Sequence, residues 1–393
     1  MPYLDHAAGS PLRPEARRAL LAAYDAAHGN PAGAHRAARA SRRVLDDARE
    51  VVAAAVGAHP AGVVFTSGGT EADNLAVLGA VDAAGGVAVC SAVEHHAVLD
   101  PVLARRAVAG DVAVTAGVGR DGVIDAADLA AVLDRLAAQQ RPVAVVSVMA
   151  LNNEVGVIQP VGALVEVVRR HAPGALVHCD AVAAAPWLDL VDVTAGCDLV
   201  SISSHKVGGP PGVGALVGRD GALRRLAPRQ LGGGQEHGVR PGTQDVAGAS
   251  AFAAALTATA THRPVEVPRV SALRDRLLAG LRAAVPGLVV TVLDGDAPVS
   301  PGTCHVCIPG VHSDELLFLL DRDDVAASAA SACSSGAQLR SHVLAAMGVA
   351  PAAASGALRL SLGWSPTEAD VDAAVRSTGR AVDRLRPFAE VAP

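Results

Sequence analysis

The chain has 393 residues, 51% of them hydrophobic, and a formal net charge of −6. This length suggests one large domain plus a smaller one, and a mildly negative chain without a basic block is not typical of nucleic-acid-binding proteins. No apolar run is long enough to span a bilayer, and residues 1–6 lack the basic region and apolar stretch of a secretory signal, so we expect no membrane segment.

Short apolar runs alternate with helical stretches from about residue 15 to 250. The runs that we predict as strands are 63–65, 87–90, 112–114, 143–149, 176–179, 199–203 and 213–217. Amphipathic or Ala-rich segments, such as 70–81 and 161–171, lie between several of them. This alternation predicts an α/β domain with a mainly parallel, seven-stranded sheet covered by helices on both faces.

The pattern changes after residues 265–268, which we interpret as a linker or a helix start. The elements expected beyond them are a helix at 270–284, strands at 288–293 and 303–308, a helix at 313–321, and a strand at 357–362. We therefore predict a large domain over residues 15–260 and a smaller α+β domain formed by residues 1–14 and 261–393.

Lys206 is the only lysine in the chain, although arginine is abundant. Because arginine stays protonated, a solitary lysine suggests a task that needs a nucleophilic amine, while a chance surviving surface lysine is the alternative. Lys206 follows the predicted strand 199–203, and open parallel sheets bind ligands beyond the carboxyl ends of their strands. This position favours the functional interpretation.

Other strand ends carry residues that suit one cofactor. The glycine-rich turn 66–70 runs into a helix, which suits a phosphate but also an ordinary tight turn. His95 could stack on a flat ring, cap a helix or bind a metal, although no second ligand pair supports the metal. Asp180 could pair with a pyridinium nitrogen or cap a helix. Together with a lysine that binds covalently, these features predict a pyridoxal-phosphate (PLP) enzyme.

The chain resembles the cysteine desulfurases of the NifS/IscS type, which have the class V aminotransferase fold, a PLP-dependent transferase fold of type I. The matching segments run almost end to end: 3–5, 29–31, 66–74, 94–95, 152–156, 178–181, 205–206, 232–236, 240–243 and 331–333.

The resemblance implies a role for each residue around the cofactor. The residues that would hold the cofactor phosphate are Gly69, Thr70, Ser203 and His205. Thr243 would reach the phosphate in the partner subunit of a homodimer.

Four residues would act at the cofactor ring. Lys206 would bind the cofactor covalently, and His95 would stack on the ring and move protons. Asp180 would pair with the ring nitrogen, and Asn153 would form a hydrogen bond near the ring oxygen or the substrate.

The resemblance also implies how the substrate is bound. Arg359 would hold the carboxylate of the substrate through a bidentate contact, with Asn30 close by. Without the resemblance, Arg359 would be interpreted as an ordinary strand-edge arginine.

The six cysteines are scattered, which is typical of thiols in a reducing compartment, so we expect a cytoplasmic protein. Cys333 lies among small and polar residues, unlike a buried structural cysteine, and the resemblance implies that it is the nucleophile that accepts sulfur. We interpret the others as structural or uninformative. Cys304 and Cys307 would lie on opposite faces of one strand, which opposes a shared metal.

The implied reaction converts L-cysteine to L-alanine and places the sulfur on Cys333 as a persulfide. The sulfur would then pass to an acceptor, such as an iron–sulfur scaffold or a tRNA-thiolating enzyme. Two alternatives remain: another PLP-dependent C–S or C–Se lyase (a selenocysteine lyase or a sulfinate desulfinase), or a non-catalytic partner protein.

The chain departs from the family pattern at a few positions. Ala183 stands where a glutamine usually donates to the ring oxygen, and this could mark a non-catalytic member. Ser204 stands where glycine is usual, and Gly208 stands where tyrosine is common. Gly9 and Ser10 replace the usual pair of threonines near the N-terminus.

Overall fold

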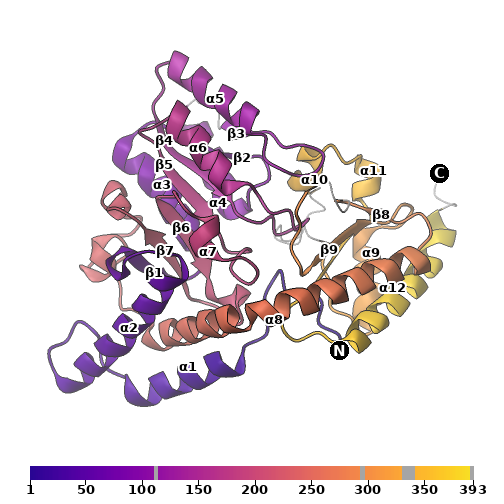
Figure 1. Cartoon of the computed structure of the whole chain (residues 1–393), viewed down its shortest axis with the longest axis horizontal. Helices are drawn as coiled ribbons and strands as arrows, with labels where there is room; N and C mark the ends of the chain where they lie inside the picture. Colours follow the sequence, from indigo (N-terminus) through magenta and orange to yellow (C-terminus); the bar gives the residue numbers. More distant parts are fainter. Residues whose placement is uncertain (110–113, 293–296, 330–340, 390–393) are drawn as a thin grey trace.

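Within residues 1–109, 114–292, 297–329 and 341–389, which the computed structural model describes, seven strands form one sheet in the larger part of the molecule (Figure 1). They are β1 (Val63–Thr66), β2 (Val87–Ser91), β3 (Val114–Ala116), β4 (Val143–Met149), β5 (Leu176–Asp180), β6 (Leu199–Ser203) and β7 (Gly214–Gly218). The order is β1-β7-β6-β5-β4-β2-β3, in which β7 runs antiparallel to both neighbours and the other pairs are parallel. The predicted mainly parallel sheet is confirmed.

Helices cover both faces of this sheet because its strands are apolar on both sides. Leu176 packs on one face in a cluster with α3 and α4, whereas Val177 packs on the other face with α2, α5, α6 and the start of α8. The helices of this part are α1 (Pro14–Ala26), α2 (Arg36–Ala55), α3 (Gly69–Ala84), α4 (His96–Ala109), α5 (Ala126–Ala138), α6 (Val161–His171), α7 (Leu190–Val193) and the first half of α8 (Val246–Ala284). Short 3₁₀ turns are η1 (Pro60–Gly62), η2 (Ser204–Lys206), η3 (Ala222–Arg225) and η4 (Gln235–Gly238).

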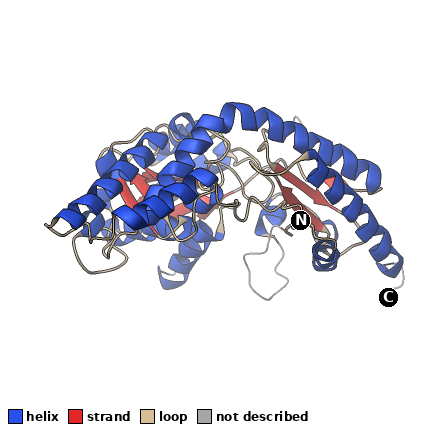
Figure 2. Ribbon diagram, turned by 90° about the horizontal axis from the view of Figure 1, so that it is seen from below, coloured by secondary structure: helices blue, strands red, loops and turns tan. Residues whose placement is uncertain are grey.

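A second, antiparallel sheet forms the centre of the smaller part. Among the described residues its order is β10 (Ala357–Ser361), β9 (Thr303–Cys307) and β8 (Val289–Val290). Its core includes residues of the second half of α8, α9 (Ser313–Arg322) and α12 (Glu368–Ala389). Leu4 belongs to the same core, and Figure 2 shows the N-terminus beside these strands. The N-terminal segment therefore lies with the smaller part.

Two short helices follow the third gap in the described residues, after residue 340. They are α10 (His342–Ala346) and α11 (Pro351–Ala354). Val343 and Leu344 of α10 pack into the core of the larger part, although the strands on either side of them in sequence belong to the smaller part. This segment therefore links the two cores.

The interpretation of residues 265–268 as a linker or helix start was wrong, because they lie inside α8, which runs unbroken through both parts. Its buried residues between 249 and 256 pack in the larger core and those between 270 and 281 in the smaller one. Pro264 and Pro268 lie between these buried stretches and are exposed, so the carbonyl groups that lose a helical partner there can bind water. The predicted division near residue 260 falls within this helix and stays a prediction.

None of the helices in the described parts of the chain is both long and apolar enough to cross a membrane.

Candidate active site

The turn between β1 and α3 packs tightly against the ends of β5 and β6. Gly69 is the first residue of α3, and a Cβ there would lie 2.7 Å from Cγ2 of Val182 and 3.7 Å from Cβ of Ser203. Since the first N–H groups of a helix have no intrahelical acceptor, those at the start of α3, beside Thr70, can bind an anion. The Ser203 hydroxyl lies 2.8 Å from Nδ1 of His205. The predicted phosphate-binding residues other than Thr243 therefore gather here.

Lys206 follows β6 directly, and its ammonium group contacts the N-terminal segment. Nζ donates hydrogen bonds to the carbonyl oxygens of Ala7 and Ala8, the latter at 3.1 Å. Burial, followed by the positive charge of Lys206, lowers the pKa of His95 and of His205 to about 4 each. Both imidazoles are therefore neutral at pH 7 and can accept a proton.

Asp180 is the last residue of β5 and lies at the same edge of the sheet. Its carboxylate is buried, and Oδ1 accepts a hydrogen bond from the N–H of Val182 at 2.9 Å. Burial raises the pKa of Asp180 to about 6, although this N–H group and the charge of Lys206 act to lower it. Because a buried carboxylate is stabilised by a cation, this position suits a protonated ring nitrogen.

Arg359, on β10, brings the smaller part of the molecule to the site. Its side chain is 5% exposed, Nη1 donates to the carbonyl oxygen of Asn153 at 2.7 Å, and Nη2 pairs with Asp5 at 2.9 Å. Nε is buried and has no hydrogen-bond partner within the described residues. The guanidinium therefore keeps an unused donor, as a carboxylate-binding arginine requires.

Known proteins match the chain over nearly its whole length. The family model Aminotransferase class-V matches residues 2–374. The chain belongs to the class V aminotransferase family. An IscS-like cysteine desulfurase from Mycobacterium tuberculosis is 40% identical over 395 residues, which span 98% of this chain and 97% of that relative.

Solved structures of related proteins have the same fold as this chain. A NifS-like protein superposes with a TM-score of 0.88 at 29% identity, over 98% of this chain and 99% of that one. A structure of SspA in complex with cysteine has a TM-score of 0.76 at 28% identity, over 92% and 99% of the two chains.

Class V aminotransferases are PLP-dependent, and the residues of this site fit that cofactor. The N-terminus of α3 at Gly69 and Thr70 offers backbone N–H groups that can bind a phosphate group. Asp180 is a buried carboxylate suited to the ring nitrogen, and Lys206 lies on the same edge of the sheet. The chain therefore has groups for the phosphate, the ring and the covalent attachment.

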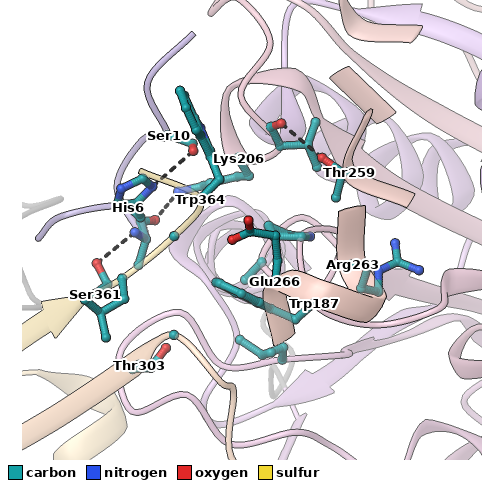
Figure 3. A pocket seen from close by; sticks show the side chains of 18 of the residues that line it. His6, Ser10, Trp187, Lys206, Thr259, Arg263, Glu266, Thr303, Ser361 and Trp364 are labelled. Atoms are coloured by element: carbon teal, nitrogen blue, oxygen red, sulfur yellow. Dashed lines mark hydrogen bonds between the residues drawn. The ribbon is translucent and has the colours of Figure 1, made fainter. Parts of the chain in front are cut away.

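A cavity of about 50 Å³ lies beside Lys206, between the two parts of the molecule (Figure 3). Its lining includes Asn153 and Ala183, together with Trp187 and Trp364, the two tryptophans of the chain. Ala183 has no hydrogen-bonding side chain, so the cavity lacks the donor that the resemblance led us to expect at this position.

Two other departures from the family pattern are accommodated by their neighbours. A Cβ at Gly209 would lie 2.1 Å from Oγ of Ser204, so the hydroxyl of Ser204 occupies the space that this glycine leaves. Gly208 has φ +82°, and a Cβ there would lie 2.6 Å from Cγ of Arg13. The Arg13 N–H donates to the Gly208 carbonyl at 2.8 Å. These contacts tie the N-terminal segment to the turn that carries Lys206.

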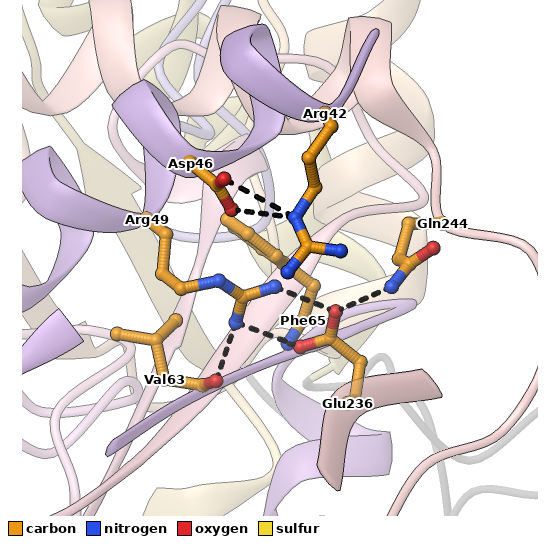
Figure 4. Close-up of polar contacts among 7 residues, drawn as sticks. All are labelled: Arg42, Asp46, Arg49, Val63, Phe65, Glu236 and Gln244. Atoms are coloured by element: carbon orange, nitrogen blue, oxygen red, sulfur yellow. Dashed lines mark hydrogen bonds and ion pairs between the residues drawn. The ribbon is translucent and has the colours of Figure 1, made fainter. Parts of the chain in front are cut away.

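A buried ion pair holds the loop that leads to Thr243 (Figure 4). Both carboxylate oxygens of Glu236 bind Arg49, at 2.7 and 2.9 Å, and they also accept from the Phe65 N–H and the Gln244 amide. Burial would raise the pKa of Glu236, but Arg49 and these donors outweigh it and hold the pKa below its usual value. Thr243 itself is exposed, and its role toward a partner subunit stays a prediction.

Asn30 is not brought to Arg359 in the structure. It is exposed in the loop between α1 and α2, where its Oδ1 accepts from the Ala32 N–H at 3.0 Å. Its role in binding substrate stays a prediction.

Cys333 lies outside the described residues, but the residues on both sides of its segment contact the site. Ser328 exchanges two backbone hydrogen bonds with Arg359, at 2.7 and 3.1 Å. Ser341 donates from Oγ to the Glu154 carboxylate at 2.5 Å. Ser328 therefore contacts Arg359, a predicted site residue, and Ser341 contacts the residue that follows Asn153.

The five cysteines in the described residues are all buried. Cys304 packs in the core of the smaller part and Cys307 in that of the larger part, so the prediction that they face opposite sides is confirmed. Burial raises the pKa of Cys304 to about 12 and that of Cys90 well above its usual value. Such thiols are poor nucleophiles.

Three buried polar residues at this edge were not predicted as site residues, although all lie in the matching segments. His178 is fully buried and lies 2.7 Å from the Ser147 hydroxyl through Nδ1 and 2.9 Å from the Ser201 hydroxyl through Nε2. Burial lowers its pKa to about 3, so it is neutral. Asp73 lies 3.5 Å from its Nε2, and burial followed by the charge of Asp180 raises the pKa of Asp73.

The third, Glu94, directly precedes His95. It is fully buried, and Oε1 accepts from the Ser91 hydroxyl at 2.8 Å and from the Met149 N–H at 2.7 Å. Burial, followed by the charge of Asp180, raises the pKa of Glu94 to about 8. Glu94 lies in the turn after β2, and only the folded chain shows that its carboxyl group is buried.

Proposed function

We propose that this chain is a PLP-dependent cysteine desulfurase, a sulfurtransferase that converts L-cysteine to L-alanine and passes the sulfur to an acceptor. One observation carries the proposal most strongly. The short segment Asp5–Ala8 contacts both Lys206, through the carbonyl groups of Ala7 and Ala8, and Arg359, through the Asp5 carboxylate. An amine that can carry the cofactor and a guanidinium that can bind a carboxylate therefore lie against the same short segment, as a site for an α-amino acid substrate requires.

Each of these residues has a task in the reaction. Lys206 would bind the cofactor covalently and release it to the substrate amine, while Arg359 holds the substrate carboxylate. PLP, when bound, supplies an electron sink for negative charge at the α-carbon of the substrate. His95 is neutral and can accept a proton, and the amine of Lys206, once freed, could take a proton from the α-carbon of the substrate.

Cys333 would take the sulfur atom. Its thiolate attacks the sulfur of the bound cysteine, so an S–S bond forms on Cys333 while the carbon–sulfur bond of the substrate breaks. The electron pair of the broken bond stays with the carbon, which takes up a proton and becomes the methyl group of alanine. One cysteine and one Cys333 thiol therefore yield one alanine and one persulfide.

The partners of this reaction are part of the proposal. We infer a cytoplasmic homodimer, in which the exposed Thr243 reaches the cofactor phosphate of the partner subunit. The sulfur acceptor would be an iron–sulfur scaffold or a tRNA-thiolating enzyme. The similarity to cysteine desulfurases and to SspA in complex with cysteine supports L-cysteine as the substrate.

Replacing Cys333 separates this function from the alternatives. In Cys333→Ala we expect the visible absorption of the bound cofactor to remain, while sulfur transfer from L-cysteine stops because no persulfide can form. Sulfide release at the wild-type rate would instead indicate another C–S or C–Se lyase. A wild-type protein that gains no visible band with added PLP would be a non-catalytic family member.

A further inference from the structure

The N-terminal segment lies between β10 and the residues after α9, and its backbone is fixed on both sides. The Leu4 N–H donates to the Ala326 carbonyl at 2.9 Å, and the Ser361 N–H donates to the Leu4 carbonyl at 2.7 Å. The His6 N–H donates to the Ser361 carbonyl at 3.2 Å. Asp5 is therefore held in place by both of its neighbours in sequence.

The carboxylate of Asp5 meets a guanidinium that is otherwise almost enclosed. Arg359 is 5% exposed and Asp5 21% exposed at the side chain, and Nη2 lies 2.9 Å from Oδ1. Nη1 donates to the Asn153 carbonyl, so two directions of the planar guanidinium are fixed. His305, the cross-strand partner of Arg359, has a pKa lowered to about 3 by burial and by Arg359, so it adds no charge.

The donor that remains is Nε, which is buried and without a partner in the part of the chain that the structure describes. An unpaired buried donor is costly, so it indicates a partner that binds there. Because Asp5 and Asn153 fix the plane of the guanidinium, they also fix the direction in which the Nε–H points. A carboxylate needs that direction for a well-aligned, charge-assisted hydrogen bond.

We propose that Asp5 is a positioning residue that orients Arg359 toward the α-carboxylate of the substrate and so makes the site selective for amino acids over simple amines. This inference rests on the proposed function. Asp5 acts through Arg359 and does not itself touch the reacting atoms.

The test compares two ligands that differ only in the carboxylate. L-Alanine, the proposed product, and ethylamine are titrated into the PLP-loaded protein, and binding is followed by the change in visible absorption. In Asp5→Ala the affinity for L-alanine is expected to fall roughly ten- to a hundredfold because Arg359 loses its orientation. Ethylamine binding is expected to stay unchanged. For L-cysteine turnover, KM should rise more than kcat falls.

Two further variants separate orientation from other effects. Asp5→Asn removes the charge but keeps an oxygen acceptor, so it should bind L-alanine within about threefold of wild type. Tyr3→Phe serves as the matched control, since the Tyr3 hydroxyl donates to backbone carbonyls of the same segment and not to Arg359. It should leave the ratio of the two affinities unchanged.

The proposal is overturned if Asp5→Ala keeps the wild-type ratio of L-alanine to ethylamine affinity, or if Tyr3→Phe lowers that ratio as much. These outcomes differ from a failure of the proposed function. A wild-type protein that discriminates between the two ligands through Asp5 but forms no alanine from L-cysteine would refute the desulfurase reaction and retain the role of Asp5.

Discussion

Buried carboxyl groups occur in two regions of this molecule, and their pKa values shift in opposite directions. Glu236 is bound by Arg49, and its pKa lies below the usual value. At the carboxyl ends of the central strands, burial raises the pKa of Asp180 to about 6 and that of Glu94 to about 8. The first region has a cation that outweighs the effect of burial, whereas in the second the charge of Lys206 lowers the pKa of Asp180 without offsetting burial.

This difference indicates what each region does. An ion pair that satisfies every oxygen of its carboxylate holds a loop in place and leaves nothing to bind. Carboxyl groups buried without a paired cation cost stability, so they persist where a cationic group, here the ring nitrogen of PLP, can bind beside them. If the two regions are separate in this way, substitutions at the strand ends should affect catalysis and substitutions at the ion pair should affect stability.

Replacing Lys206 should have the largest effect, because the strand-end region then loses its one lysine. In Lys206→Ala we expect no covalent cofactor band in the visible spectrum and a loss of alanine formation of roughly 10⁴-fold or more. Circular dichroism should show an unchanged fold. A variant that keeps the wild-type visible band would refute the assignment of Lys206.

Asp180→Asn should disable the chemistry while the fold is retained. The amide has nearly the same shape but cannot carry the negative charge that pairs with a protonated ring nitrogen, so kcat should fall by about 10²- to 10³-fold. The variant should unfold in urea at nearly the wild-type concentration. A fall in stability without a fall in kcat would place Asp180 in the structural region instead.

Arg49→Ala should act on stability, since it leaves the Glu236 carboxylate buried without its cation. We expect the free energy of unfolding to fall by about 3–5 kcal/mol, measured by urea denaturation. Arg42→Ala is the matched control, because Arg42 pairs with Asp46 on the same helix but is 61% exposed (Figure 4). It should cost no more than about 0.5 kcal/mol. Equal losses in both variants would contradict the importance of the buried pair.

Glu94→Gln should change how stability depends on pH. The folded pKa of Glu94, about 8, lies above its value in the unfolded chain, so the unfolded chain loses this proton first as pH rises. The wild type should therefore lose stability between about pH 4.5 and pH 8, by at most about 1.4 kcal/mol per pH unit from this group. Glutamine has no such proton, so urea denaturation of the variant should show a flatter profile. Identical profiles would mean that Glu94 is ionised in the fold.

The sequence predicted the sheet well because its strands are short, β-branched runs bounded by turns, and their burial on both faces leaves a clear signal. The prediction for residues 265–268 was wrong, since a proline usually ends a helix and Pro264 and Pro268 therefore indicate a helix boundary in the local sequence. Only the three-dimensional packing of both ends of α8 shows that the helix continues.

The site was predicted in part for a similar reason. Lys206, Asp180 and His95 stand at strand ends, where sequence position already determines which edge of the sheet they reach. Asp5 and Arg359 are 354 residues apart, and their contact depends on how the N-terminal segment pairs with β10. The hydrophobic periodicity of the sequence cannot predict a contact between residues so far apart in the chain. Glu94 and Asp73 appeared as ordinary charged residues because burial is a property of the folded chain.

The proposed reaction needs both Lys206 and Cys333 to transfer sulfur from cysteine, and a single turnover tests this requirement. The PLP-loaded protein is incubated with L-cysteine in the absence of any acceptor or added thiol, and alanine and the mass of the peptide containing Cys333 are measured. We predict one alanine per subunit and one added sulfur atom on Cys333. Alanine without added sulfur on Cys333, or no alanine at all, would contradict the account.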